Sequence, residues 1–308
     1  MAPSKPARRR QAAALRAERF GGVLSRELLR GLGVDRHAIQ REVDGDRWRC
    51  HGSQTVAVHT RSLDPPALWW RAVWETGQRI AVLDGVSALL AAGVTGYDEA
   101  VVHVSISSAI NRSGILGVRV HRVRRVDGEV ITGRGIPRVA PALAAIRAAH
   151  WASSDRQAAL ILVLPVQQGV VSGSQLQTAS TVWVGRRRRA LVPVLVQDIA
   201  DGARSLGELD FALLCRQRGL PEPDRQVVRR TPRGRVYLDV RWRRSRLVVE
   251  IDGSHHGVGL AMVADHLRQN EVALQREVVL RITLLGLRVA ADTFLDQVAR
   301  SLREVDSA

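Results

Sequence analysis

YLDVRW (residues 237–242) and LVVEIDGSHH (residues 247–256) are two neighbouring strand patterns that carry acidic residues. Asp239 lies inside the first pattern. Glu250 and Asp252 end the second, two positions apart and therefore on the same side of the strand. A tight hairpin between the strands would bring Asp239 near them. We therefore expect three carboxylates to converge at one sheet edge.

Carboxylates this close repel one another unless a cation neutralises them. Oxygen ligands favour Mg²⁺ or Mn²⁺ over zinc, and such an ion activates water and stabilises phosphoryl oxygens in hydrolysis. His256, beyond Gly253, is placed to act as an acid, as a base or as a hydrogen-bond donor to the phosphate. In the alternative interpretation, Asp239 and Asp252 are ordinary strand-end and turn residues. That leaves Glu250 unexplained, because an unpaired carboxylate inside an apolar run is costly.

The surrounding pattern predicts a domain of α/β or α+β type, with helices covering a mixed sheet. Three helices are expected, at residues 205–218, 262–275 and 293–303. Four strands are expected, at residues 226–230, 236–242, 247–251 and 278–282.

The region from about residue 205 to 303 resembles the endonuclease domains related to very-short-patch-repair endonucleases, in the restriction-endonuclease-like PD-(D/E)XK superfamily. That family combines a carboxylate-bearing helix, an Asp in the second strand, a Val–Glu–Ile–Asp–Gly–x–x–His run, an Asp–x–x–Arg–x–Asn helix and a Leu–Arg–Ile strand. The residues of this chain on those positions are Glu208, Asp239, Glu250, Asp252, His256, Asp265, Arg268, Asn270 and Arg281.

The resemblance implies a role for most of these residues. The implied ligands of Mg²⁺ or Mn²⁺ are Asp239, Glu250 and Asp252. Glu208 would be an accessory carboxylate, while His256 and Arg281 would contact the phosphate or the water. Asp252 stands where the superfamily usually has a lysine, which leaves the general base open.

Arginines surround the acidic residues. Residues 225–246 contain nine Arg and a single acidic residue, Asp239. A rim of Arg beside a carboxylate cluster suits a site that holds a phosphodiester backbone. The residues expected to contact DNA here are Arg241, Arg243, Arg244 and Arg268. The alternative is a solvated surface that is rich in Arg because the genome is GC-rich.

The N-terminal region predicts a winged helix. Ser25 is a suitable N-cap for a helix over residues 25–30, and Asp35 for a helix that ends near residue 43. Short strand patterns follow at residues 48–50 and 55–58, which completes the motif. Residues 1–16 are expected to form a basic tail.

Residues 21–60 resemble the winged-helix region of AbiEi-type antitoxins, which are transcriptional regulators. The matching segments are Leu24–Ser25–Arg26, Leu32–Gly33–Val34, Ile39 and Arg47–Trp48. The resemblance implies that four outward residues face the DNA major groove: Arg36, His37, Gln40 and Arg41. A protein–protein role for the same small domain is the alternative.

Composition points to a polyanion as partner. The 308-residue chain has a formal net charge of +16, and every one of its 46 basic residues except Lys5 is Arg. Such a charge makes nucleic acid the default partner. Without a lysine in the folded part, P-loop, Schiff-base and nuclease-lysine mechanisms are excluded or must be rewritten.

The chain has no run of about 18 apolar residues and no apolar core of a signal peptide. Cys50 and Cys215 form neither a disulfide framework nor a zinc site. We therefore expect a cytoplasmic protein without a membrane span.

Four regions are expected: the tail at 1–16, the winged helix at 17–62, an AbiEi-like, mixed but mostly helical middle region at 63–200, and the nuclease domain at 201–308. The predicted function is DNA binding with magnesium-dependent phosphodiester hydrolysis. The alternative is an AbiEi-like regulator or antitoxin with a degenerate nuclease fold. RNA as substrate, a homodimer and a toxin partner remain open.

Overall fold

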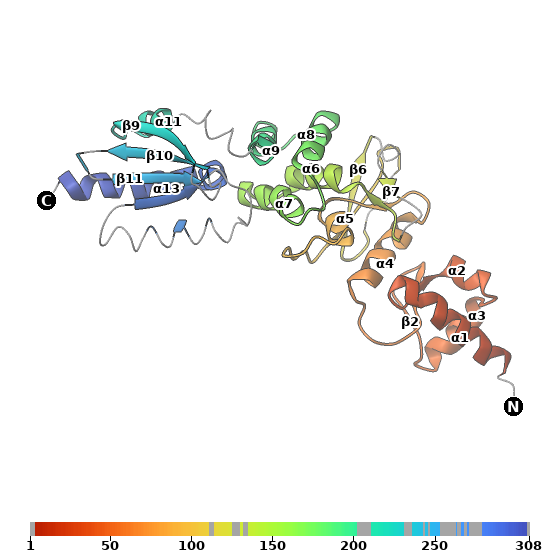
Figure 1. Ribbon diagram of the computed structural model, residues 1–308. Coiled ribbons are helices and arrows are strands. Elements are labelled where there is room, and N and C mark those ends of the chain that lie inside the picture. The colour runs from red at the N-terminus through yellow and green to blue at the C-terminus, as the bar shows by residue number, and fades with distance from the viewer. Residues whose placement is uncertain are drawn as a thin grey trace. The chain divides into compact units, whose positions relative to one another are not determined.

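The computed structural model describes residues 4–110, 114–124, 130–131, 135–201, 211–230, 236–242, 244–245, 247–252, 263, 266–267, 270 and 279–306. These residues form a mixed α/β structure with eleven α-helices and three small sheets (Figure 1). The chain divides into two compact units, Met1–Ala144 and Ala145–Ala308. Among the described helices, none has the length and apolar character needed to cross a membrane.

The first unit begins with short helices around a three-stranded sheet of order β1-β3-β2. The elements are α1 (Lys5–Ala17), the 3₁₀ helix η1 (Glu18–Phe20), β1 (Val23–Ser25), α2 (Arg26–Gly31), α3 (Arg36–Asp44), β2 (Arg49–Cys50) and β3 (Thr55–Ala57). The predicted caps are confirmed, since the Ser25 hydroxyl accepts from the Leu28 amide and the Asp35 carboxylate from the Ala38 amide. Strand β1 was not predicted because three residues show no alternation.

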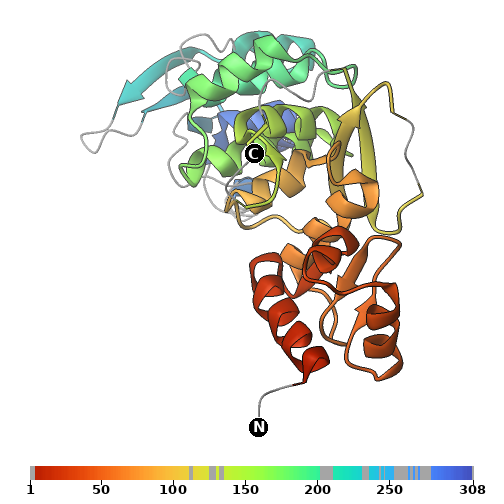
Figure 2. The ribbon, with the colours of Figure 1, turned by 90° about the vertical axis from the view of Figure 1, so that its right-hand side faces the viewer.

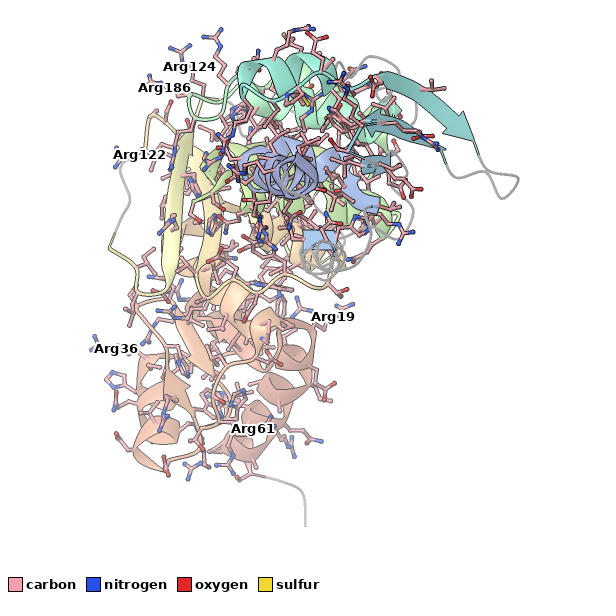
Figure 3. All side chains as sticks on the ribbon, turned by 90° about the vertical axis from the view of Figure 1, so that its left-hand side faces the viewer. Arg19, Arg36, Arg61, Arg122, Arg124 and Arg186 are labelled. Atoms are coloured by element: carbon pink, nitrogen blue, oxygen red, sulfur yellow. The ribbon has the colours of Figure 1, made fainter. Side chains whose placement is uncertain are left out.

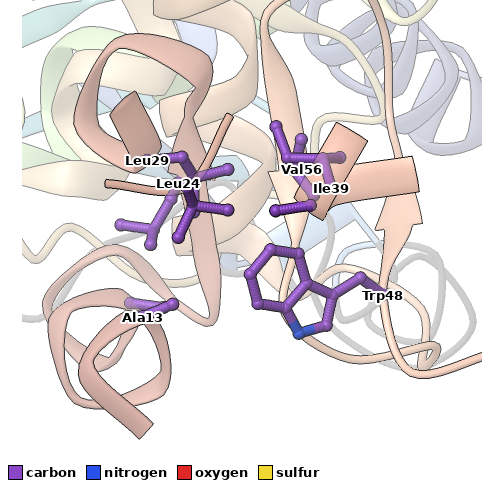
Figure 4. Close-up of a cluster of buried hydrophobic side chains, with 9 residues drawn as sticks. Ala13, Leu24, Leu29, Ile39, Trp48 and Val56 are labelled. Carbon is purple, nitrogen blue, oxygen red and sulfur yellow. The ribbon is translucent and has the colours of Figure 1, made fainter. Parts of the chain in front are cut away.

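The expected basic tail is wrong for residues 5–16, which belong to helix α1. Ser4 caps this helix and a proline lies in its first turn. Its side chains Ala13 and Ala17 are fully buried. They join a core that also contains Leu24, Leu29, Val34, Ala38, Ile39, Trp48 and Val56 (Figure 4). Five basic residues of α1 suggested a tail, and the buried face of the helix consists of alanines, which give a weak apolar signal.

The rest of the first unit contains a five-stranded sheet of order β6-β5-β4-β8-β7. Its elements are α4 (Pro65–Gly77), β4 (Val82–Leu83), α5 (Gly85–Ala91), β5 (Val102–Ser107), β6 (Val118–Val123), β7 (Val130–Ile131) and β8 (Arg138–Val139). The long strands β5 and β6 pair in parallel (Figure 2, yellow). The two-residue strands were missed, so this part of the middle region is less helical than expected.

The second unit begins with a helical segment. Its helices are α6 (Pro141–Trp151), α7 (Asp155–Gln167), α8 (Gly173–Val182) and α9 (Leu191–Asp201). Helix α6 starts just before the boundary between the units. Ser154 caps α7, and Ser172 forms a capping box with Gln175 at the start of α8. The mostly helical character expected for the middle region up to residue 200 is confirmed in this segment.

A four-stranded sheet of order β12-β11-β10-β9 ends the chain. Its strands are β9 (Arg225–Arg230), β10 (Val236–Trp242), β11 (Leu247–Asp252) and β12 (Val279–Thr283). Helix α11 (Phe211–Gln217) precedes them and helix α13 (Leu284–Asp306) follows them. β12 runs parallel to β11 and the other neighbours are antiparallel. The last helix begins earlier than the predicted residue 293, and a non-helical Ala290 divides it.

This C-terminal sheet has one apolar face. The side chains that fill it are Leu238, Val240, Trp242, Leu247, Val249, Ile251, Leu280 and Ile282, each at most 4% exposed. Phe211 of α11 meets Trp242 edge to face at 6.3 Å between ring centroids. Helix α13 packs along β11 and β12 with Phe294 buried. Because side chains alternate along a strand, the intervening residues share the opposite face.

Candidate active site

The two central strands bring three carboxylates onto that opposite face. Asp239 of β10 lies directly across from Glu250 of β11, and Asp252 lies across from Tyr237. Directly opposite residues have Cβ atoms about 4.5–5.5 Å apart. The predicted hairpin is therefore confirmed. The carboxylates lie on a face between central strands, whereas a sheet edge was expected.

Two arginines share the face with the acids. Arg241 binds Asp239 through both carboxylate oxygens, with Nε–Oδ1 at 2.8 Å and a terminal nitrogen 2.9 Å from Oδ2. Arg281 of β12 is in register with Glu250, and its Nε lies 3.5 Å from Glu250 Oε2. Asp239 is only 4% exposed and Asp252 6%. Buried carboxylates need such partners, because an unpaired buried charge is costly.

The donor types and the strand register suit a hard divalent cation, which prefers several carboxylate oxygens. The side-chain positions do not gather these oxygens. Within the described residues, no group of three His, Cys, Asp or Glu side chains is arranged to hold a metal ion. The carboxylate of Asp239 is turned onto Arg241. The residues therefore fit a cation by their chemistry and strand register, but Arg241 occupies both carboxylate oxygens of Asp239.

A buried amide holds the outer strand of this site in place. Asn270, 1% exposed, accepts from the Arg281 amide at 2.9 Å and donates to the Arg281 carbonyl at 3.0 Å. Gln297 of α13 accepts from Asn270 at 3.0 Å and donates to the Leu267 carbonyl. Asn270 thus substitutes for a neighbouring strand at the β12 edge. Sequence analysis missed Gln297, whose only signal is a polar residue in an apolar helical stripe.

Several predicted site residues lie outside the described residues: Glu208, His256, Arg243, Asp265 and Arg268. Their roles stay predictions. Arg244 is described and exposed, in the turn between β10 and β11.

Helix α3 exposes the four residues predicted to face DNA. Arg36, His37, Gln40 and Arg41 are exposed, while Ala38, Ile39 and Glu42 point inward. The Arg36 side chain extends from the surface in Figure 3, and its Nε donates to His37 Nε2 at 3.3 Å. The Ala38 amide, which donates to the Asp35 carboxylate, lowers the pKa of Asp35 at the start of this helix.

The turn between β2 and β3 is clamped by a residue that sequence analysis missed. Glu75 of α4 accepts from the Ser53 and Gln54 amides, both at 2.8 Å, and from the Thr55 hydroxyl at 2.7 Å. Burial alone would raise the pKa of Glu75. Hydrogen bonds from these three residues outweigh burial, so that the pKa of Glu75 is lowered. Arg26 adds a bond to the Ser53 carbonyl at 2.8 Å.

A histidine pair lies in the five-stranded sheet. His103 of β5 is 6% exposed, and its Nδ1 lies 3.1 Å from Nε2 of His121 on the neighbouring strand β6. Burial and the nearby positive charge of Arg119 lower the pKa of His103 to about 4. Glu99 lies 3.9 Å from the other ring nitrogen. His103 is therefore neutral at pH 7.

In comparisons with known proteins, no family model and no curated sequence matches this chain.

Proposed function

We propose that this protein binds DNA through its N-terminal region and hydrolyses DNA phosphodiester bonds at the polar face of its C-terminal sheet. The observation that carries the proposal is the pairing of Asp239 with Glu250 across two central strands, with Asp252 on the same face. The opposite face is apolar core. This arrangement supports a restriction-endonuclease-like nuclease that uses Mg²⁺ or Mn²⁺ held by these three carboxylates.

The bound cation would supply an activated water and stabilise charge on the phosphoryl oxygens. The chain's own residues bind and orient the substrate. Arg241 and Arg281 lie beside the carboxylates and are about half exposed, so each guanidinium can reach a phosphate from solvent. Arg suits this role because its planar fork binds phosphate through two hydrogen bonds.

The N-terminal part of the proposal is a winged helix that positions the nuclease on DNA. Helix α3 offers Arg36 and Arg41 for phosphates, with His37 and Gln40 for base edges. The turn between β2 and β3 would be the wing. Its hydrogen bonds to Glu75 and Arg26 support a pre-organised contact, which reduces the entropy lost on binding.

The test is plasmid cleavage by the full-length protein with Mg²⁺, with Mn²⁺ and with chelator. We expect metal-dependent nicking that Asp239→Asn and Glu250→Gln each abolish while DNA binding remains. Glu222→Gln is the matched control. That carboxylate is also paired with an arginine, at 2.9 Å, outside the proposed site, and the variant should cut like wild type. No cutting by wild type under either metal would contradict the nuclease proposal.

One observation favours a second candidate, a DNA-binding regulator that does not cut. Arg241 occupies both oxygens of Asp239, as a structural ion pair would in a degenerate nuclease fold. A regulator would protect a defined DNA site without divalent metal, and Glu250→Ala would leave that protection intact.

A further inference from the structure

Arg241 stands out on the polar face because it blocks the carboxylate that the proposed function needs. Its guanidinium uses two nitrogens, 2.8 and 2.9 Å from the two oxygens of Asp239. This bidentate geometry is the strongest that an arginine and a carboxylate form. A divalent cation on Asp239 would lie next to a full positive charge, and the two repel. The cation and Arg241 therefore compete for Asp239.

The two partners of this ion pair differ in exposure. The Asp239 side chain is 5% exposed, whereas the Arg241 side chain is 48% exposed. The carboxylate is fixed in the sheet, and the guanidinium can be reached from solvent. A phosphodiester offers it two non-bridging oxygens, which the guanidinium fork can bind as it binds the two oxygens of Asp239. The neighbouring pair of Arg281 and Glu250 is longer, at 3.5 Å, and competes less.

We propose that Arg241 is an internal counter-ion that keeps a divalent cation off Asp239 until a nucleic-acid phosphate takes its guanidinium. Cation binding and substrate binding are then mutually reinforcing, and each ligand raises the affinity for the other by the same factor. The inference rests on the proposed function, since it assumes that Asp239 is a cation ligand. It adds that the site binds metal more weakly in the absence of substrate.

The test measures Mn²⁺ affinity by calorimetry on the full-length protein, with and without a short duplex carrying hydrolysis-resistant phosphorothioate linkages. Without DNA, Arg241→Ala should bind Mn²⁺ about tenfold more tightly than wild type, which corresponds to about 1.4 kcal/mol. The duplex should raise the affinity of wild type by a similar factor and that of Arg241→Ala much less. Arg241→Lys keeps the charge without the fork and should fall between them.

Arg216→Ala is the matched control. The Arg216 side chain is 47% exposed and pairs with Glu222 at 2.9 Å, so its loss removes the same charge at nearly the same exposure. Its helix α11 covers the apolar face of the sheet. This variant should bind Mn²⁺ like wild type.

The outcomes distinguish a failure of the coupling between metal and DNA binding from a failure of the proposed nuclease function. Equal Mn²⁺ affinity in wild type and Arg241→Ala, or no effect of the duplex on wild type, overturns the coupling and leaves a metal site in place. The comparison of wild type with and without the duplex needs no variant, so it holds even if a variant misfolds. No Mn²⁺ binding by any protein in any arm would overturn the proposed function together with the coupling.

Discussion

At the residue scale, His103 links the stability of the five-stranded sheet to pH. Its pKa is lowered to about 4 by burial and by Arg119, from 6.5. Between these values the unfolded chain binds a proton that the folded chain does not bind. The free energy of unfolding should therefore fall as the pH falls through this window, by about 3 kcal/mol in total.

The measurement is urea unfolding of wild type and His103→Gln across that pH range. The variant should lose this part of the pH dependence, and above pH 6.5 the two curves should run parallel. A His103→Gln curve as steep as wild type between about pH 4 and pH 6.5 would show that this histidine does not stay neutral in the fold.

At the element scale, helix α1 should be a structural part of the N-terminal core. Ala13 is fully buried there, and Ala14, next along the same helix, is exposed. Ala13→Asp places an unpaired carboxylate in the core and should cost at least about 3 kcal/mol. Ala14→Asp has the same effect on helix propensity, about 0.7 kcal/mol or less, and no burial.

Urea unfolding followed by tryptophan fluorescence can measure the difference, because Trp48 is buried in the same core. A difference between the two variants below about 1 kcal/mol would mean that α1 is dispensable for the fold.

Much of the element order could be predicted because its signals are local. Ser25 and Asp35 each cap the helix that was expected after them. Elements without local signal were missed. Strands β4, β7 and β8 have two residues each, which is too few for a pattern. Helix α1 was missed because its alanines are buried only through tertiary contacts with the rest of the core.

For the candidate site, the sequence likewise predicted what depends on local pattern and not what depends on tertiary contacts. Alternation along YLDVRW and LVVEID placed Asp239, Glu250 and Asp252 on one face, and the observed register agrees. The Arg241 ion pair was not predicted, since it depends on a side-chain orientation. The contact between Gln297 and Asn270 joins residues 27 positions apart, and sequence spacing does not reveal such tertiary contacts.

At the scale of the whole molecule, the net charge of +16 raises the question whether DNA affinity comes from total charge or from particular surfaces. The salt dependence of affinity separates the two. Each phosphate neutralised contributes about −0.9 to the slope of log K against log salt concentration. If α3 contacts DNA, Arg36→Ala and Arg41→Ala should each reduce the slope by about 1 unit.

Arg79→Ala is the control for this measurement. It removes the same charge from an exposed arginine that pairs with Glu27 of α2 at 3.4 Å and does not belong to α3. Its slope should match wild type. Equal slopes in all three variants would show that the charge acts as a whole and that α3 has no special contact.

The two-faced C-terminal sheet has a consequence for how such a protein changes over generations. Alternate residues of β10 and β11 lie on different faces of the sheet. Leu238, Val240 and Val249 belong to the buried core that stabilises the fold. Asp239 and Glu250 lie on the face opposite that core. Selection for folding therefore acts on one set of codons, and selection for the proposed chemistry would act on the set between them. A lineage can lose or regain the acidic residues and still inherit the same scaffold, so under the proposed function a cutting form and a form that only binds DNA would be separated by few substitutions.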